Sequence, residues 1–182
     1  MRHSDIVPTG VEYKLGWDDI IVSKTDAKGH LVYINDVFVD ISKYDESELI
    51  GQPHSIVRHP EMPRSVFKLL WDTITAGEEL FAYIVNLSKD GGHYWVLAHV
   101  TPTFDASGTI VGYHSNRRAP APAAVAQIED LYRTILRAEN TAGSTPAALA
   151  AGTDVLNMTL QQRGMSYDQF VWSITNDALV GA

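Results

Sequence analysis

The sequence predicts an α+β fold in which helices cover one face of a five-stranded antiparallel sheet. Two short β-rich runs, 20–24 and 30–35, stand near the start, and helical periodicity fills 36–77. Three more β-rich runs follow between residues 81 and 118. Tight turns join neighbouring runs, which indicates antiparallel pairing, and helices gathered in the middle of the chain can cover a single sheet face.

The first two strands are expected to form a hairpin. The five residues TDAKG separate them, and Asp26 and Gly29 are residue types that suit a tight connection. Apolar positions in 36–51 then follow the spacing of short helical turns, and Gly51 ends them.

One longer helix is predicted over 63–77. Pro63 suits its first turn and Gly77 its end. Its apolar residues recur at intervals of three and four, which places them on one side of the helix. They are Val66, Phe67, Leu70, Trp71 and Ile74.

The three later strands are expected to form a meander. A D-G-G turn and the sequence DASG separate them, as is typical of antiparallel connections. A period of two places Ile84 and Asn86 on one face of the first of these strands and Phe81 on the other. Pro102 cannot donate to a strand ladder, which predicts a strand edge or a bulge there. The strands are expected within 81–90, 93–104 and 109–118.

Beyond residue 119 the composition shifts to alanine and proline, and three helices are predicted. The first carries an apolar stripe over 125–136, and the second is expected to be weaker and interrupted by Gly152. Ser166 and Gln169 form a capping-box pattern ahead of the third, short helix. The expected organisation is an N-terminal cap at 1–18, a sheet domain at 19–119 and a C-terminal helical extension at 120–182.

Charge and composition exclude several classes of protein. The 182 residues contain 14 Lys and Arg against 22 Asp and Glu, a net charge of -8, which argues against binding to nucleic acid or anionic lipid. No apolar run approaches the length of about 20 residues that a membrane-spanning helix needs, and the start lacks the apolar centre of a secretion signal. There are no cysteines, so thiolate chemistry is excluded. We therefore expect a cytoplasmic protein without membrane insertion.

Residues 51–64, GQPHSIVRHPEMPR, gather positive charge in this acidic chain. Arg58, His59 and Arg64 stand among the three prolines of this segment, and His54 is close by. Two interpretations are open: the segment binds an anionic group, or Arg58 pairs internally with Glu61 while the prolines fix a turn.

The same segment carries a resemblance to a known family. YINDVF at 33–38, the stretch 48–77 and KDGGHYWVLAHVTP at 89–102 resemble the flavin-binding PAS domains of bacterial aerotaxis receptors. The resemblance runs from about residue 19 to residue 119. It implies a PAS fold and noncovalent binding of FAD, through which that family senses redox state or oxygen supply.

Matched by position, the resemblance implies seven candidate cofactor contacts. An arginine can hold a pyrophosphate, aromatic rings can line a flavin, and an inward asparagine can bond its polar edge. The chain departs from the family pattern at two positions, with glutamate in place of the usual aspartate at 61 and leucine in place of a tryptophan at 80. The candidates are Asn35, Arg58, His59, Glu61, Phe67, Trp71 and Asn86.

The sequence thus predicts a redox or oxygen sensor that signals through a partner protein or through self-association as a homodimer. A PAS gas sensor with haem on His54 or His59 is the main alternative. A cofactor-free interaction module is a further one. We expect neither a resident metal ion nor enzymatic activity, because His93 and His99 would lie roughly 20 Å apart on one strand and no catalytic motif is present.

Overall fold

The structure is a computed structural model that describes residues 6–180, with side chains described for residues 6–176. The chain forms two compact units. The first, called the sheet unit, comprises the described residues up to 59 together with 73–119. The second, called the helical unit, comprises 60–72 and the described residues from 120 onward. The chain crosses between the units within its longer central helix and at residues 59 and 119.

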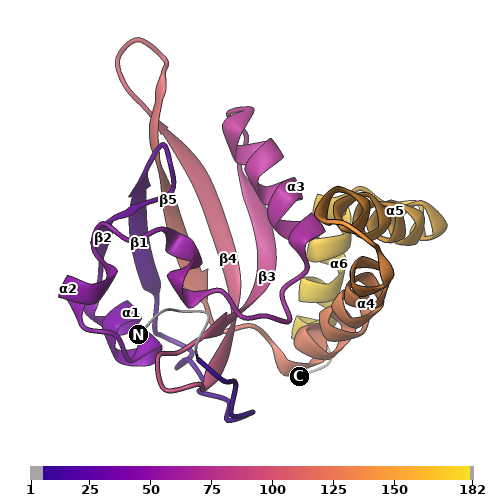
Figure 1. The fold of residues 1–182 in the computed structure, drawn as a ribbon, viewed down its shortest axis with the longest axis horizontal. Helices are drawn as coiled ribbons and strands as arrows, with labels where there is room; N and C mark the ends of the chain where they lie inside the picture. Colours follow the sequence, from indigo (N-terminus) through magenta and orange to yellow (C-terminus); the bar gives the residue numbers. More distant parts are fainter. Residues whose placement is uncertain (1–5, 181–182) are drawn as a thin grey trace. The chain divides into compact units, whose positions relative to one another are not determined.

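The sheet unit contains five strands in the order β2-β1-β5-β4-β3, and every neighbouring pair is antiparallel (Figure 1). The predicted fold class is therefore confirmed. Pro102 lies inside β4, and the register shifts one residue further on, between Thr103 and Phe104. The strands are β1 Ile21–Asp26, β2 Leu31–Ile34, β3 Leu80–Leu87, β4 His93–Phe104 and β5 Ile110–Arg118.

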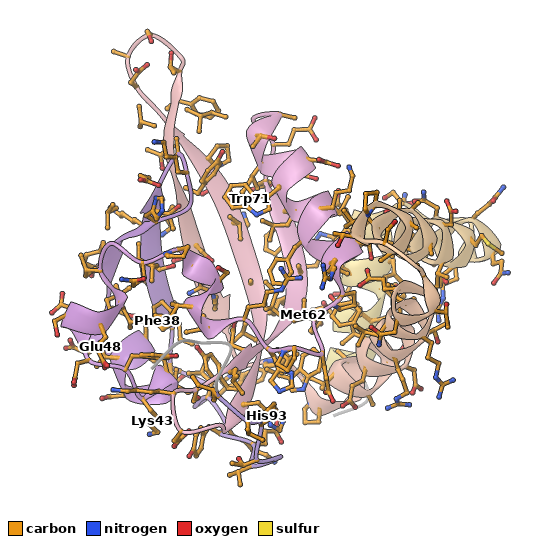
Figure 2. All side chains as sticks on the ribbon, viewed as in Figure 1. Phe38, Lys43, Glu48, Met62, Trp71 and His93 are labelled. Atoms are coloured by element: carbon orange, nitrogen blue, oxygen red, sulfur yellow. The ribbon has the colours of Figure 1, made fainter. Side chains whose placement is uncertain are left out.

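Two short helices follow β2, as the sequence predicts, and a 3₁₀ turn comes after the predicted end at Gly51. They are α1 Asp36–Ser42, α2 Glu46–Leu49 and the 3₁₀ turn His54–Val57. Asn35 caps α1 by accepting a hydrogen bond from the backbone of Phe38. Lys43 ends α1 in the left-handed region, with φ of 62°. The buried Phe38 lies on α1 beside the sheet (Figure 2).

The N-terminal segment pairs beside the first residue of β4. Tyr13 N donates to the carbonyl of His93 over 2.7 Å, and His93 N donates to the carbonyl of Val11 over 2.8 Å. The hydroxyl of Tyr13 donates to Asp90 over 2.6 Å. Residues 1–5 of the predicted N-terminal cap lie outside the described residues. The described part lengthens the paired region at one end of β4.

The helical unit contains the first nine residues of α3 Arg64–Thr75, with α4 Pro122–Thr141, α5 Thr145–Arg163 and α6 Tyr167–Val180. Helix α4 packs against α5 and α6 (Figure 1). The predicted apolar stripe is buried in this packing through Ile128, Leu131, Tyr132 and Ile135. The predicted capping box is present, since Ser166 and Gln169 each accept a hydrogen bond from the other's backbone, and it precedes α6.

The prediction that Gly152 interrupts the second C-terminal helix is wrong. Helix α5 runs through it without a break. A Cβ atom at this position would lie 2.5 Å from Glu139 Oε1 and 2.7 Å from Ser65 Oγ. Glycine is therefore required by the close approach of side chains from α4 and α3, and its low helix propensity is offset by the packing on either side.

Candidate functional site

Two of the predicted site residues lie side by side in the sheet unit. The backbones of Arg58 and Asn86 form an isolated antiparallel bridge, which attaches the segment after the 3₁₀ turn to β3. Asn86 is 4% exposed, and Arg58 is half-buried. The basic motif is thus held against the strand that carries the buried amide.

Strand register defines which residues share the face of Asn86, called here the inner face. Ala82 lies two positions before Ile84 and therefore on the same side of β3. Its cross-strand row continues through Ala98, Arg117 and Ile21. The next row on this face consists of Leu80, Val100, Ser115 and Ser23. The inner face therefore carries a charged residue and two serines among apolar side chains.

Phe81 lies on the opposite face, where its ring stacks on His99 with centroids 4.0 Å apart. The pairing of β3 with β4 is continuous from Leu80 to Leu87, so no shift of register turns Phe81 inward. Leu80, which is 3% exposed, supplies the inner-face side chain at this end of the strand.

Arg117 is the central polar residue of the inner face. It is 4% exposed, and its Nη2 donates a hydrogen bond to Ser23 Oγ over 2.9 Å. The same nitrogen contacts His54 Nε2, which must accept because a guanidinium only donates. The guanidinium carbon lies 5.3 Å from the ring centroid of Phe38, within the range of a cation–π interaction.

The electrostatics of this cluster follow from its burial. Burial and the nearby charge of Arg117 lower the pKa of His54 to about 3, so the imidazole is neutral at pH 7. Burial lowers the pKa of Arg117 to about 10, and the guanidinium remains charged. Burial raises the pKa of Tyr94 above its ordinary value. No carboxylate among the described residues forms a salt bridge with Arg117.

Two polar atoms of the inner face have unused hydrogen-bonding capacity. Arg117 Nη1 and Ser115 Oγ are buried and have no hydrogen-bond partner within the part of the chain that the structure describes. Leaving such groups unpaired costs roughly 1–3 kcal/mol each, and more where the group is charged. The arrangement suits a bound molecule that offers acceptor atoms and tolerates or carries negative charge.

The other predicted residues have varied environments. The side-chain amide of Asn35 joins β1 to α1: Oδ1 accepts from Val22 N over 2.9 Å, and Nδ2 donates to the carbonyl of Ile20 over 2.8 Å. His59 is 4% exposed, with its ring 5.7 Å from that of His93. The remaining three belong to the helical unit, where Glu61 is exposed, Phe67 is half-buried and Trp71, labelled in Figure 2, is 38% exposed.

Sequence reasoning did not identify Arg117, Ser115 and Ser23. The available signal was the alternation in GYHSNRR, which places Ser115 and Arg117 on one face of β5. Both faces of that strand carry polar residues, so alternation did not show which of them is buried.

No group of three or more metal-ligating side chains that could hold an ion occurs in the described part of the chain. None of the described helices combines the length and the apolar character needed to cross a membrane.

Comparison with known proteins identifies the family. Residues 31–117 match the family model described as PAS fold. The chain is 39% identical over 118 residues to the aerotaxis receptor of Escherichia coli (strain K12), a match covering 65% of this chain and 23% of the receptor. It is 26% identical over 140 residues to the bacterioopsin transcriptional activator of Halobacterium salinarum, covering 74% of this chain and 21% of the activator. The chain thus spans less than a quarter of these curated relatives.

Among solved structures, the dark structure of the blue-light photoreceptor Aureochrome1 LOV is similar in fold. The TM-score is 0.52 at 24% identity, and the match covers 64% of this chain and 84% of that one. The strand order, the family match and this structural likeness agree, and the chain contains a PAS domain, matched over residues 31–117.

Proposed function

We propose that the chain is a redox or oxygen sensor that binds FAD noncovalently on the inner face of the sheet unit. The observation that carries this proposal is the buried guanidinium of Arg117, which within residues 6–176 has neither a carboxylate partner nor an acceptor for Nη1. The polar edge of a flavin offers acceptor atoms and takes on negative charge when the ring is reduced. It therefore matches both properties of the cluster.

Five residues of the sheet unit have a defined role in this proposal. Arg117 and Ser115 donate to acceptor atoms of the ring system, and the buried amide of Asn86 bonds its polar edge. Arg58, attached to Asn86 through the backbone bridge, neutralises the pyrophosphate. Asn35 has a positioning role, because its amide already bonds Val22, Ile20 and Phe38.

The proposal also retains the candidates that the family resemblance supplies outside this cluster. Each of them rests on the family resemblance alone. They are His59, Glu61, Phe67 and Trp71.

The flavin supplies the redox chemistry, and the protein supplies electrostatics. Because Arg117 is buried, its charge is poorly screened and favours negative charge on a neighbouring group. His54 is neutral at pH 7 and accepts from Arg117, so it orients the guanidinium without adding a second positive charge. Reduction would thus change the charge at the inner face, which is the event a sensor needs.

A haem sensor is the second candidate, and the geometry at His54 does not favour it. Nε2 of His54 accepts a hydrogen bond from Arg117. A histidine that binds haem iron would need a free ring nitrogen, Nε2 or Nδ1, and here a guanidinium cation lies beside the ring. His59 is buried, with its ring centroid 5.7 Å from that of His93.

Output is proposed to pass to a partner protein or to a second copy of the chain, and the domain itself is proposed to be non-catalytic. Helices α4 to α6 follow the PAS domain directly in the sequence. Exposed apolar residues remain on its described helices, among them Met158 and Trp172.

A titration of the ligand-depleted protein with FAD, FMN and haemin tests the proposal. Saturable, equimolar uptake of FAD, weakened by Arg58→Ala and Arg117→Met, is expected. Arg118→Met is the matched control, because Arg118 is exposed on the same strand. Uptake of haemin alone would show that the cofactor is haem and not flavin. If none of the three binds, a cofactor-free interaction module is the function that remains.

A further inference from the structure

The helical unit contains a buried carboxylate that caps a helix distant in the sequence. Glu139 lies near the end of α4 and is 6% exposed. Its Oε2 accepts from Arg64 N over 2.9 Å, and its Oε1 accepts from Ser65 N over 2.9 Å and from Ser65 Oγ over 2.8 Å. The first turn of α3 thus obtains its acceptors from a residue 75 positions further along the chain.

These bonds satisfy amides that a helix cannot satisfy itself. The first N–H groups of an α-helix have no acceptor within the helix, and a carboxylate at that end also interacts favourably with the helix dipole. Pro63, which precedes α3, has no side-chain oxygen to act as a cap. The start of α3 therefore depends on α4.

Helix α5 completes the arrangement through Gly152. A Cβ atom there would lie within 2.8 Å of three atoms of Glu139 and Ser65. Helices α3, α4 and α5 meet at this point, and no side chain larger than that of glycine fits without displacing the carboxylate. We call Ser65, Glu139 and Gly152 the α3 latch.

We propose that the α3 latch is a conformational device that makes the first turn of α3 and the helices α4 and α5 open and close as one cooperative unit. Helix α3 continues past Asp72, the last residue of that helix in the helical unit, to Thr75, which belongs to the sheet unit. A displacement of α3 along this continuous helix would reach α4 and α5 through Glu139. The use of the latch for signalling rests on the proposed function, whereas the cooperative unit itself does not.

Hydrogen–deuterium exchange of the full chain tests the latch. In Gly152→Ala and Glu139→Ala, exchange at 60–72 and in α4 and α5 is expected to rise together by about tenfold or more, with β3 to β5 unchanged. Glu139→Gln keeps one acceptor oxygen and is expected to give a smaller rise. Gly143→Ala, where nothing lies within 4 Å of the added Cβ, and the exposed Glu129→Gln are controls.

The outcomes separate the latch from the flavin proposal. A rise at 60–72 without a rise in α4 and α5, or no rise in either variant, would overturn the cooperative unit. The same measurement on wild type with and without dithionite then tests signalling. If dithionite changes exchange in both the sheet and α4–α5 of wild type, but only in the sheet of Gly152→Ala, transmission through the α3 latch is supported. A wild-type response confined to the sheet overturns transmission, and no response anywhere in wild type overturns the proposed function while leaving the cooperative unit in place.

Discussion

Arg117 of β5 and Ser23 of β1 are joined by a hydrogen bond of 2.9 Å that occupies only one terminal nitrogen of the guanidinium. The other, Nη1, has no acceptor within the described residues. A buried charge with neutral neighbours is unfavourable for folding unless something else compensates it. The proposed ligand would supply this compensation.

Replacing Arg117 by methionine separates its structural role from its binding role. Without ligand, Arg117→Met is expected to leave stability unchanged or to raise it by about 1–2 kcal/mol, because an uncompensated buried charge is removed. FAD affinity is expected to fall by about tenfold or more, and the reduction potential of the bound flavin to fall. Urea denaturation and a redox titration measure both effects, with Arg118→Met as the control. A large loss of stability together with unchanged FAD affinity would assign Arg117 a purely structural role.

His54 predicts a pH dependence of stability with a definite sign. The pKa of His54 is 6.5 in the unfolded chain and about 3 in the folded protein. Below pH 6.5 the unfolded chain binds a proton that the folded protein does not, so the free energy of unfolding falls as the pH falls towards 3. Above pH 6.5 His54 makes its full contribution to the free energy of unfolding.

The loss approaches about 1.4 kcal/mol per pH unit where only the unfolded histidine is charged. His54→Gln keeps a side-chain acceptor for Arg117 but removes the titration, so between pH 7 and pH 5 the variant should lose about 1–2 kcal/mol less than wild type. Urea midpoints at the two pH values provide the measurement. His114→Gln, which removes a histidine from the other face of β5, is the control for the substitution itself. Equal pH slopes in wild type and His54→Gln would show that burial does not suppress protonation of His54.

Asn35 is expected to act on stability rather than on ligand affinity. Asn35→Ala removes the cap of α1 and the bonds to Val22 and Ile20, at a cost of about 1–3 kcal/mol. Asn35→Asp keeps the acceptor and should lose less. Thermal denaturation and FAD titration of the folded fraction distinguish the two roles. An affinity loss without a stability loss would place the amide of Asn35 on the ligand itself.

Gly112 controls the approach of β5 to β1 and hence the position of Arg117 opposite β1. A Cβ atom on Gly112 would overlap the backbone carbonyl of Thr25, which cannot move without breaking the pairing of the two strands. Gly112→Ala is expected to destabilise the protein by about 2 kcal/mol or more, measured by urea denaturation. Gly143→Ala is the control, and a Gly112→Ala variant as stable as this control would show that the two strands can separate locally at little cost.

Much of the fold could be predicted because its signals are local. The turn sequences, the alternation along the strands and the capping box at Ser166 each act over a few residues, and the structure contains all three. Gly152 was misjudged because its environment depends on Glu139 and Ser65, which lie on other helices. Local helix propensity alone gave the wrong prediction there.

The candidate site was predictable only in part, for the same reason. The motif containing Arg58 is contiguous and therefore recognisable, and its backbone bridge to Asn86 agrees with a shared site. Arg117 and Ser23 are 94 positions apart, and burial of the guanidinium follows from strand register rather than from any short pattern.

The measurement that tests the central claim most directly is the absorption spectrum of the full chain as purified, with heat release and identification of any bound chromophore. The account predicts the two-banded spectrum of an oxidised flavin and release of FAD in an amount close to equimolar with the protein. A colourless protein that also fails to bind added FAD would contradict it, as would a protein that releases only haem.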